Sequence, residues 1–457
     1  MERSAFIVQA IVLVYLLMGI LMATIPAEVD LAKKKIFRTL RLISAAKART
    51  PLNQRESRIS RGVGIGIAVA ALFVLTQMHL RVGEMSEHQR PAWSNPAASE
   101  ETVSDTSLHH TVKRVIDPVA DQYIGLIVAT VADDEWDITG FGRINLKSNI
   151  PPDHHTLFEI GSISKVFTGI LLAEMITTTD LALDTPVSSC LPALQGSQAD
   201  TMTLEHLVTH TSGLPRMPAG TFRPSNIWKA MIAGDAYRNY TEQDLLAKVP
   251  NKPSETPSEP DVRYSNVGFG ILGMILSEQS GEDYHHLIQA RIAKPLGLQD
   301  SGVTLDEEQQ SRLATGYRSY LHLGPYYLAQ QAASWNFPNC LAAAGGLRST
   351  ASDMLVFLKA NMGQLSSDLT PVLQQSHQPL FATEEIQIGM GWFHDTLPTS
   401  DEPIIWHNGG TGGYRSFIGF TANGRFGVCV LSNSTRSVDT IGYTLLENLI
   451  AERPMIT

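Results

Sequence analysis

Two β-hairpin patterns stand near opposite ends of the stretch from residue 111 to residue 457, and they constrain its fold more than any other feature. The first joins an apolar run at 124–131 to a second run at 136–141 through an acidic turn. The second joins 416–420 to 426–431 through an Asn-Gly turn, which favours tight hairpins. We therefore predict an α/β (α+β) fold with an antiparallel sheet built from both domain ends, flanked by helices and containing a helical insertion.

The sequence between the two hairpins shows mostly the hydrophobic periodicity of α-helices. Apolar residues recur with helical spacing in 162–177 and 268–277. A last helix is predicted near the C-terminus, where Val438, Ile441 and Leu445 fall on one face. No internal repeat is visible, so the stretch from 111 onward is interpreted as one domain.

The N-terminal region contains two apolar stretches separated by a basic loop. Residues 5–25 carry no charge over 21 positions, close to the length that a helix needs to cross a bilayer. Residues 63–80 form a shorter stretch, either a second spanning helix or an uncleaved signal anchor. Ten Lys and Arg residues between the stretches predict a cytoplasmic loop. We predict a membrane anchor at 1–81, a polar linker at 82–110 and a folded domain at 111–457 on the extracytoplasmic side of the inner or plasma membrane.

The charge distribution excludes a nucleic-acid-binding function for the folded domain. Residues 1–62 contain 11 Lys and Arg against 4 Asp and Glu, a net charge of +7, which leaves −17 for the rest of the chain. A nucleic-acid-binding domain carries a basic patch, and such a strongly acidic remainder argues against one.

The cysteines and paired histidines give no sign of a metal site. Cys190, Cys340 and Cys429 are far apart and form no metal-binding pair, so we interpret them as buried thiols, with one disulfide as the alternative. The tandem histidines at 154–155 and 285–286 belong to no carboxylate or cysteine pattern with the spacing of metal ligands. No metal and no cofactor is therefore predicted.

A serine and a lysine three residues apart, Ser162 and Lys165, open the first helical pattern. This spacing places both side chains on one helix face, so the amine reaches the hydroxyl. A serine hydroxyl becomes a good nucleophile when a neighbouring base takes its proton, and burial lowers the pKa of a lysine toward this role. The spacing alone is not specific, because Ser44 and Lys47 repeat it in the basic loop.

A second motif, Tyr264-Ser265-Asn266, precedes a glycine-spaced apolar helix. A tyrosine in this place can shuttle a proton, and the asparagine can bind a substrate amide. The triplet alone is equally unspecific, because Tyr237 and Asn239 have the same spacing.

A third motif, His407-Asn408-Gly409-Gly410, opens a glycine-rich segment just before a predicted strand. Its glycines allow backbone N–H groups to approach a ligand closely. A phosphate-binding loop is the competing interpretation, but the Gly-Lys-Ser/Thr ending of such a loop is missing.

The three motifs in this order resemble those of the penicillin-recognising serine hydrolases, in particular the branch of class C β-lactamases, D-Ala-D-Ala carboxypeptidases and related esterases. The resemblance spans residues 112–455 and implies a serine β-lactamase/transpeptidase-like fold. Further segments resemble that branch, namely FEIG at 158–161, LALDTP at 181–186, LVTHTSGL at 207–214, PLGL at 295–298 and AGGLRST at 344–350.

The resemblance implies a role for each matching residue. Ser162 is the nucleophile, Lys165 the base that activates it, and Tyr264 the group that protonates the leaving group. The backbone N–H groups of Ser162 and Gly410 form the oxyanion hole. The residues implied in substrate binding are Asn266, His407, Asn408 and Gly409.

Position 407 departs from the class C β-lactamases, which carry lysine there. An ammonium attracts the carboxylate of a β-lactam, whereas an imidazole with an ordinary pKa of about 6.5 is mostly neutral at pH 7. A histidine is more similar to certain D-Ala-D-Ala peptidases and esterases. We expect carboxylate binding to improve as the pH falls through the imidazole pKa, unless Arg348 or Arg415 already supplies the charge.

The predicted function is a membrane-anchored serine hydrolase that forms an acyl-enzyme on Ser162 and is D-Ala-D-Ala peptidase-like or esterase-like. The alternatives are a β-lactamase and a catalytically silent sensor or binding module. The predicted substrate is a small molecule or a peptidoglycan peptide, and the sequence predicts no oligomeric state. His210, within LVTHTSGL, is predicted to be a structural histidine bonded in the core.

Overall fold

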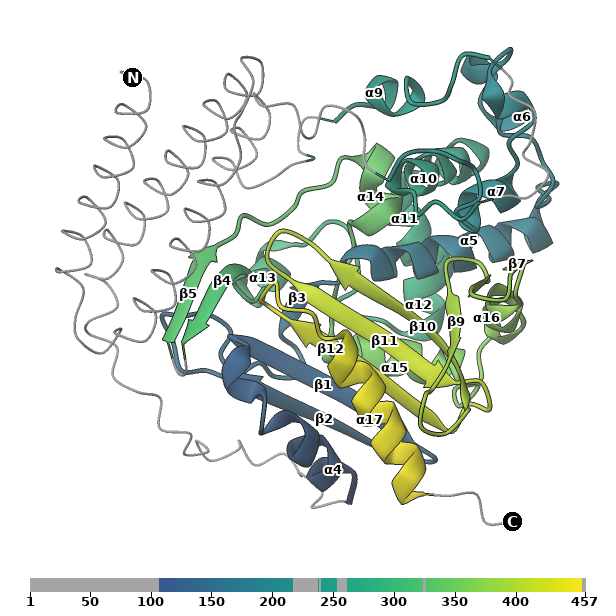
Figure 1. The fold of residues 1–457 in the computed structure, drawn as a ribbon. Coiled ribbons are helices and arrows are strands. Elements are labelled where there is room, and N and C mark those ends of the chain that lie inside the picture. The colour runs from purple at the N-terminus through teal and green to yellow at the C-terminus, as the bar shows by residue number, and fades with distance from the viewer. Residues whose placement is uncertain (1–106, 217–236, 238–239, 253–260, 324–325, 454–457) are drawn as a thin grey trace, which may run out of the picture. The chain divides into compact units, whose positions relative to one another are not determined.

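The computed structural model describes residues 107–216, 237, 240–252, 261–323 and 326–453 (Figure 1). The predicted anchor at 1–81 and almost all of the linker at 82–110 lie outside the described residues, so membrane anchoring stays a prediction. Within the described residues, no helix combines the length and the apolar character that crossing a membrane requires.

The main sheet has eight strands in the order β2-β1-β12-β11-β10-β9-β8-β7, with neighbours paired antiparallel. The N-terminal and C-terminal strands meet in the β1/β12 pair, where Val128 lies opposite Val430. Both predicted hairpins, and the antiparallel sheet built from both domain ends, are confirmed. The strands of this sheet are β1 (Gly125–Ala132), β2 (Glu135–Gly142), β7 (Phe381–Ala382), β8 (Gln387–Ile388), β9 (Phe393–Thr396), β10 (Pro403–Gly410), β11 (Arg415–Thr421) and β12 (Phe426–Ser432).

The helical insertion lies between β2 and β7 in the sequence and also contains two small sheets, β3 (Leu157–Glu159) with β6 (Arg348–Thr350) and β4 (Tyr317–Leu323) with β5 (Tyr326–Gln331). The α-helices of the described residues are α4 (Ser107–Ile116), α5 (Ser164–Thr178), α6 (Val187–Cys190), α7 (Leu204–Val208), α9 (Glu242–Leu246), α10 (Asn266–Ser280), α11 (Tyr284–Ile288), α12 (Lys294–Leu296), α13 (Glu307–Ser311), α14 (Asn339–Gly345), α15 (Ala351–Asn361), α16 (Thr370–His377) and α17 (Asp439–Glu452). Short 3-10 turns are η2 (Ala120–Gln122), η3 (Gly161–Ile163), η4 (Pro192–Leu194) and η5 (Gln198–Asp200), and η6 (Gln289–Ala293) is a π-helical turn.

Helices cover both faces of the main sheet. On one face, seen in front of the sheet in Figure 1, Ile441 and Leu445 of α17 belong to the same buried cluster as Val128 of β1. The other face presents residues such as Ile127 and Ile418, which belong to a separate core shared with α5 and α15. Because successive strand residues point to opposite faces, a strand covered on both sides is buried along its whole length, as β1 is.

The end of β10 packs against the turn that precedes α5. Gly161 has a φ of +53°, and a Cβ atom at this position would lie 2.5 Å from the backbone nitrogen of Gly410. A Cβ atom at Gly409 would lie 2.0 Å from the carbonyl oxygen of Ile160, which also accepts a hydrogen bond from Ser416. Only glycines permit this approach of two backbones. This close backbone contact places the end of β10 directly beside the η3 turn.

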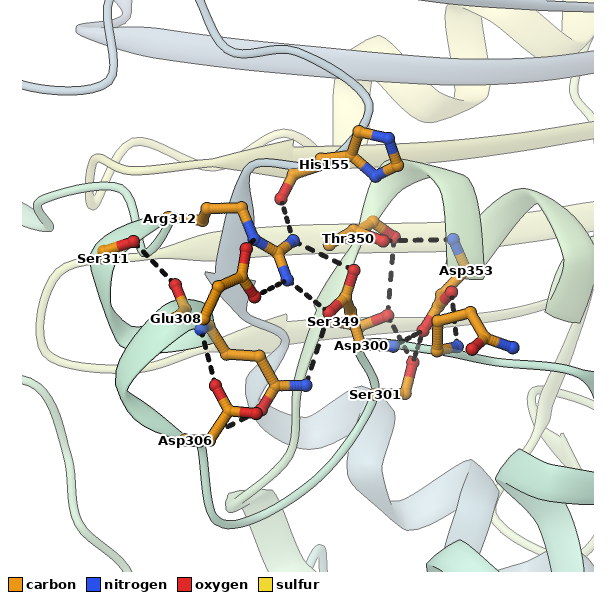
Figure 2. Close-up of polar contacts among 12 residues, drawn as sticks. His155, Asp300, Ser301, Asp306, Glu308, Ser311, Arg312, Ser349, Thr350 and Asp353 are labelled. Carbon is orange, nitrogen blue, oxygen red and sulfur yellow. Dashed lines mark hydrogen bonds and ion pairs between the residues drawn. The ribbon is translucent and has the colours of Figure 1, made fainter.

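A polar cluster joins the segment around α13 to the start of α15 (Figure 2). The carboxylate of Asp353 accepts hydrogen bonds from the backbone N–H of Asp300 at 2.7 Å and from the hydroxyl of Ser301 at 2.8 Å. Arg312 forms ion pairs with both Asp300 and Glu308. A buried carboxylate is tolerated when several donors satisfy it, so this cluster has a structural role.

The three cysteines form no disulfide, and one histidine of the second tandem pair is ion-paired, with Nδ1 of His286 2.6 Å from Asp283. Cys190, Cys340 and Cys429 are free and buried, which confirms their interpretation as buried thiols. Among the residues that the structure describes, no group of three His, Cys, Asp or Glu side chains is arranged to hold a metal ion.

Candidate active site

Ser162 and Lys165 lie on two consecutive elements. Ser162 is half-buried in η3, and Lys165 is fully buried in the first turn of α5. The Nζ atom of Lys165 lies 3.2 Å from Oγ of Ser162. The predicted contact is present, although the α-helix begins at Ser164 and not at Ser162. The first turn is of 3-10 type, a frequent form at helix N-termini.

The amine of Lys165 has two further oxygen atoms within hydrogen-bond distance. Nζ lies 2.8 Å from Oδ1 of Asn266 and 2.5 Å from the carbonyl oxygen of Ala344. Both oxygens only accept hydrogen bonds, so they take the two N–H groups of a neutral amine and leave its lone pair for the hydroxyl of Ser162. Burial lowers the pKa of Lys165 well below its ordinary value, and the charge of Arg216 lowers it further. The amine can therefore accept the proton of Ser162.

Tyr264 supplies a hydroxyl at the same serine. Its side chain is hydrogen-bonded to Ser162, and burial raises the pKa of Tyr264 to about 12. The Nζ atom of Lys165 lies 4.8 Å from the centroid of the Tyr264 ring. The next residue, Ser265, caps α10 by accepting a hydrogen bond from the N–H of Gly268, which fixes this segment. Tyr264 therefore presents a neutral hydroxyl group to the nucleophile, and its ring lies beside the base.

His407 lies on β10 and is fully buried. Its Nδ1 atom lies 2.5 Å from the carbonyl oxygen of Asn408, and because a carbonyl only accepts, Nδ1 carries the proton. Its Nε2 atom is buried and has no hydrogen-bond partner among the described residues. Burial, and secondarily the charge of Lys165, lowers the pKa of His407 to about 3. The imidazole is neutral, with a free acceptor at Nε2.

This result changes the expected pH dependence at position 407. The imidazole does not gain a proton near pH 6.5, so the improvement in carboxylate binding predicted around that pH is not supported. The physical reason is the complete burial of the ring, which disfavours the charged form. The two arginines considered as alternative sources of positive charge are already hydrogen-bonded. Arg348 donates to the carbonyl oxygens of Val303 and Trp335, and Arg415 donates to the carbonyl oxygen of Thr411.

The glycine-rich segment is divided between the two faces of the sheet. Asn408 donates a hydrogen bond of 3.0 Å to Asp439 at the start of α17, the helix on the face opposite to α5. Alternation along the strand places its side chain away from His407. The side chain of Asn408 therefore points away from the nucleophile, and the predicted role of this residue in substrate binding stays a prediction. Gly409 and Gly410 contribute backbone only, and the nitrogen of Gly410 lies beside Gly161, next to the nucleophile.

His210 supports Tyr264 from within the core. It is fully buried, and its Nδ1 atom accepts a hydrogen bond of 3.1 Å from the N–H of Ser265. The rings of His210 and Tyr264 are in contact, with their centroids 4.3 Å apart and their planes tilted by 34°. The prediction of a structural histidine bonded in the core is confirmed.

Two residues at the site were missed in the sequence. Arg216 has its guanidinium carbon 4.9 Å from the centroid of the Tyr264 ring, and Tyr237 is buried and hydrogen-bonded to Asn266. Tyr237 was set aside as an unspecific repeat of the Tyr-x-Asn spacing, and Arg216 belongs to no chemically interpretable motif. The one available signal is the position of Arg216, two residues after the LVTHTSGL segment.

Three comparisons with known proteins agree with this geometry. Residues 112–450 match the family described as Beta-lactamase. A "Beta-lactamase" of Pseudomonas fluorescens is 24% identical over 361 residues, which cover 72% of this chain and 94% of that protein. The "D-alanyl-D-alanine-carboxypeptidase/endopeptidase AmpH" of Escherichia coli (strain K12) is 25% identical, with coverage of 67% and 78%. A solved "class C beta-lactamase" is 25% identical with a TM-score of 0.63, covering 74% of this chain and 96% of its own.

Proposed function

This chain belongs to the Beta-lactamase family and is a serine hydrolase, and from that premise we propose that it cleaves peptide amides or esters through an acyl-enzyme on Ser162. The observation that carries the proposal is the set of contacts at Lys165. Two acceptor oxygens, on Asn266 and Ala344, occupy its N–H groups and leave the lone pair for Ser162. A binding module without catalytic turnover would not require a neutral amine with its lone pair directed at the serine hydroxyl.

The proposed reaction has two stages. In the first, Lys165 takes the proton of Ser162 while Oγ attacks the substrate carbonyl, and the developing oxyanion is stabilised by the N–H groups of Ser162 and Gly410. The bond to the leaving group breaks as Tyr264 gives it a proton, and Tyr264 regains a proton from the Lys165 ammonium. In the second stage, water attacks the acyl group and the same residues return the enzyme to its starting state.

The neutral state of His407 favours neutral esters and uncharged peptide amides over anionic substrates such as β-lactams. Its free Nε2 atom is a hydrogen-bond acceptor, so it favours a substrate N–H or O–H group and offers no attraction to a carboxylate. A β-lactamase is the second candidate, because relatives named β-lactamase share the fold and about a quarter of their residues with this chain.

We also propose that the apolar stretches at 5–25 and 63–80 hold the catalytic domain at the outer surface of the inner or plasma membrane. The absence of charge in the first stretch and the ten basic residues between the two support this topology. A domain placed there has access to small extracytoplasmic esters and to peptidoglycan peptides.

A hydrolysis panel tests the proposed activity. The full chain in detergent, together with Ser162→Ala, is assayed on D-Ala-D-Ala peptides, p-nitrophenyl esters and nitrocefin. We expect turnover of peptides or esters at a higher kcat/KM than nitrocefin, and no turnover by Ser162→Ala. A parent protein that hydrolyses nitrocefin best would favour the β-lactamase alternative, and one that hydrolyses none of the three would favour a silent module.

A further inference from the structure

We propose that Tyr237 is a positioning residue for the base, because it holds the side-chain amide of Asn266 in the orientation that turns its oxygen toward Lys165. This role rests on the proposed function, in which the neutral amine of Lys165 takes the proton of Ser162. Tyr237 lies outside the three motifs, so it adds a residue to the site that the sequence did not assign to it.

The amide of Asn266 can face Lys165 in two orientations. In the structure Oδ1 lies 2.8 Å from Nζ, where it accepts one N–H of the amine and leaves the lone pair for Ser162. If the amide is rotated by half a turn, its NH₂ group faces the amine and can only donate, so it occupies the lone pair that the serine proton requires. Both orientations have nearly the same shape, and a second hydrogen bond is therefore needed to select the productive one.

Tyr237 provides this second hydrogen bond. Its side chain is 2% exposed and is hydrogen-bonded to Asn266. Burial raises the pKa of the phenol, and the bond to Asn266 partly offsets this effect, as a donor that faces the phenolic oxygen does. The amide nitrogen is the only donor of an asparagine side chain, so Nδ2 faces Tyr237 and Oδ1 is left to face Lys165.

Two aromatic residues hold the ring of Tyr237. Its centroid lies 4.8 Å from that of Phe337, with the planes 21° apart, and 5.0 Å from that of Trp335 in an edge-to-face arrangement. Aromatic pairs in these geometries stabilise a contact beyond the area that they bury. Packing from two residues restricts the phenol, so its hydroxyl stays at Asn266.

A buried ion pair fixes the backbone of Trp335. Its N–H donates a hydrogen bond of 2.9 Å to Oε1 of Glu159, and its carbonyl oxygen accepts one of 2.9 Å from Nη2 of Arg348. Glu159 and Arg348 lie opposite each other on β3 and β6, and Nη2 and Oε1 are 3.9 Å apart. A buried ion pair is tolerated when further hydrogen bonds satisfy it, and both peptide groups of Trp335 contribute to this. Contacts therefore continue from β3 through Trp335 and Tyr237 to the amide beside the base.

Tyr237→Phe removes the hydroxyl and keeps the ring, so it separates the hydrogen bond from the packing. Without an acceptor at Nδ2, the amide of Asn266 populates both orientations, and only one of them leaves the amine of Lys165 able to accept the proton of Ser162. We therefore expect a slower acylation of Ser162.

Two reactions measure this acylation step. The first is hydrolysis of p-nitrophenyl acetate, an ester without an amide group, so that the predicted contact of Asn266 with a substrate amide does not contribute. The second is covalent labelling by a fluorophosphonate, in which Oγ of Ser162 bonds to phosphorus, its proton passes to Lys165 and fluoride leaves. Because fluoride leaves without a proton, the labelling rate reports on deprotonation of the serine.

The test is a double-mutant cycle between Tyr237→Phe and Asn266→Ala in the full-length protein, with Tyr123→Phe as the matched control. Tyr123 is a buried tyrosine whose hydroxyl donates to the carbonyl oxygen of Ser437, in the core on the opposite face of the main sheet. We expect Tyr237→Phe to lower kcat/KM for the ester and the labelling rate by about tenfold in the parent and by at most about twofold in Asn266→Ala, because residues that act through one another give non-additive losses. Tyr123→Phe should leave both rates within about twofold in either background.

An equal loss from Tyr237→Phe in the two backgrounds would show that the tyrosine acts independently of Asn266, and it overturns the proposal. A loss below about twofold in the parent, or a matching loss in Tyr123→Phe, overturns it as well. In each of these cases an active parent leaves the proposed function intact.

Melting temperatures test the contact when the proposed function fails. If the parent neither hydrolyses the ester nor reacts with the fluorophosphonate, the proposed function is wrong, and the same cycle is read from thermal unfolding. A hydrogen bond between the two side chains predicts that Tyr237→Phe lowers the melting temperature of the parent, and that of Asn266→Ala by less than about half as much. Equal losses in the two backgrounds overturn the inference.

Discussion

The amine of Lys165 lies closer to Oδ1 of Asn266, at 2.8 Å, than to Oγ of Ser162, at 3.2 Å. Asn266 therefore has a second role beside the predicted contact with a substrate amide. Its oxygen orients the base, and because it is uncharged it leaves the amine neutral. A carboxylate of the same size at this position has the opposite effect, since a negative charge stabilises an ammonium.

Asn266→Asp tests this role of the amide. We expect the carboxylate to raise the pKa of Lys165 by about one to three pH units, so that kcat/KM at pH 7 falls and the acid limb of its pH profile moves upward. Asn266→Ala removes the same oxygen without adding charge, and its profile should keep the parental midpoint at a lower plateau. Superimposable acid limbs for the parent and Asn266→Asp would contradict a role for Lys165 as the base.

Ser162→Ala and Lys165→Ala test the nucleophile and the base directly. Each should lower turnover by about a thousandfold or more, because residues that act as a unit give large and non-additive losses. Ser162→Ala should also abolish covalent labelling by a fluorescent penicillin. Turnover and labelling are measured on protein with a parental melting temperature, and activity within tenfold of the parent in either variant would refute the assignment.

Much of this arrangement was accessible from the sequence because it is local. Helical spacing brings Ser162 to Lys165, and Asn-Gly and acidic turns define the two hairpins. The strands β7, β8 and β9, of two to four residues, were not predicted, because such short segments show no measurable alternation. The side-chain direction of Asn408 was predictable in principle, since a strand that points His407 inward points its neighbour to the other face.

The contact of Arg216 with Tyr264 was not predictable from the sequence. The two residues are separated by a long stretch of chain and meet because the segment after α7 lies against the start of α10, where Asn266 donates to the carbonyl of Arg216. The low pKa of His407 has a similar origin, since it reflects complete burial in the folded domain. Sequence motifs identify residue types and leave such environments undetermined.

The buried carboxylate of Asp353 gives a prediction about stability. It accepts hydrogen bonds from the backbone N–H groups of Gln299 and Asp300 and from the hydroxyl of Ser301 (Figure 2). Asp353→Ala leaves these donors unsatisfied and should lower the free energy of unfolding by about 3 kcal/mol. Glu308→Ala, at an exposed residue of the same cluster, should cost less than about 1 kcal/mol. Thermal or denaturant unfolding of both variants measures the difference, and equal costs would show that burial of Asp353 is unimportant.

The topology of the N-terminal region is testable with a reporter. Alkaline phosphatase, which is active only outside the cytoplasm, is fused after Leu80, and a second fusion is made within the basic loop after Lys47. We expect activity from the first fusion and none from the second, because the positive loop is retained in the cytoplasm. An inactive fusion after Leu80 with a stable, full-length product would show that the catalytic domain is cytoplasmic.

The last prediction concerns the charge at position 407. Because the pKa of His407 is about 3, its charge does not change between pH 8 and pH 5. Over this range, kcat/KM of the parent for nitrocefin should therefore follow the same pH dependence as kcat/KM for a neutral ester. His407→Lys places an ammonium where the acceptor Nε2 now lies, and it should raise kcat/KM for nitrocefin relative to the neutral ester by about tenfold through attraction to the β-lactam carboxylate. His407→Gln keeps a neutral side chain of similar size and should leave this ratio near that of the parent, so that a gain confined to lysine is assigned to charge. The measurement is the pair of pH profiles for each protein, and a parental profile for nitrocefin that rises through pH 6.5 would mean that the ring is protonated in the working enzyme.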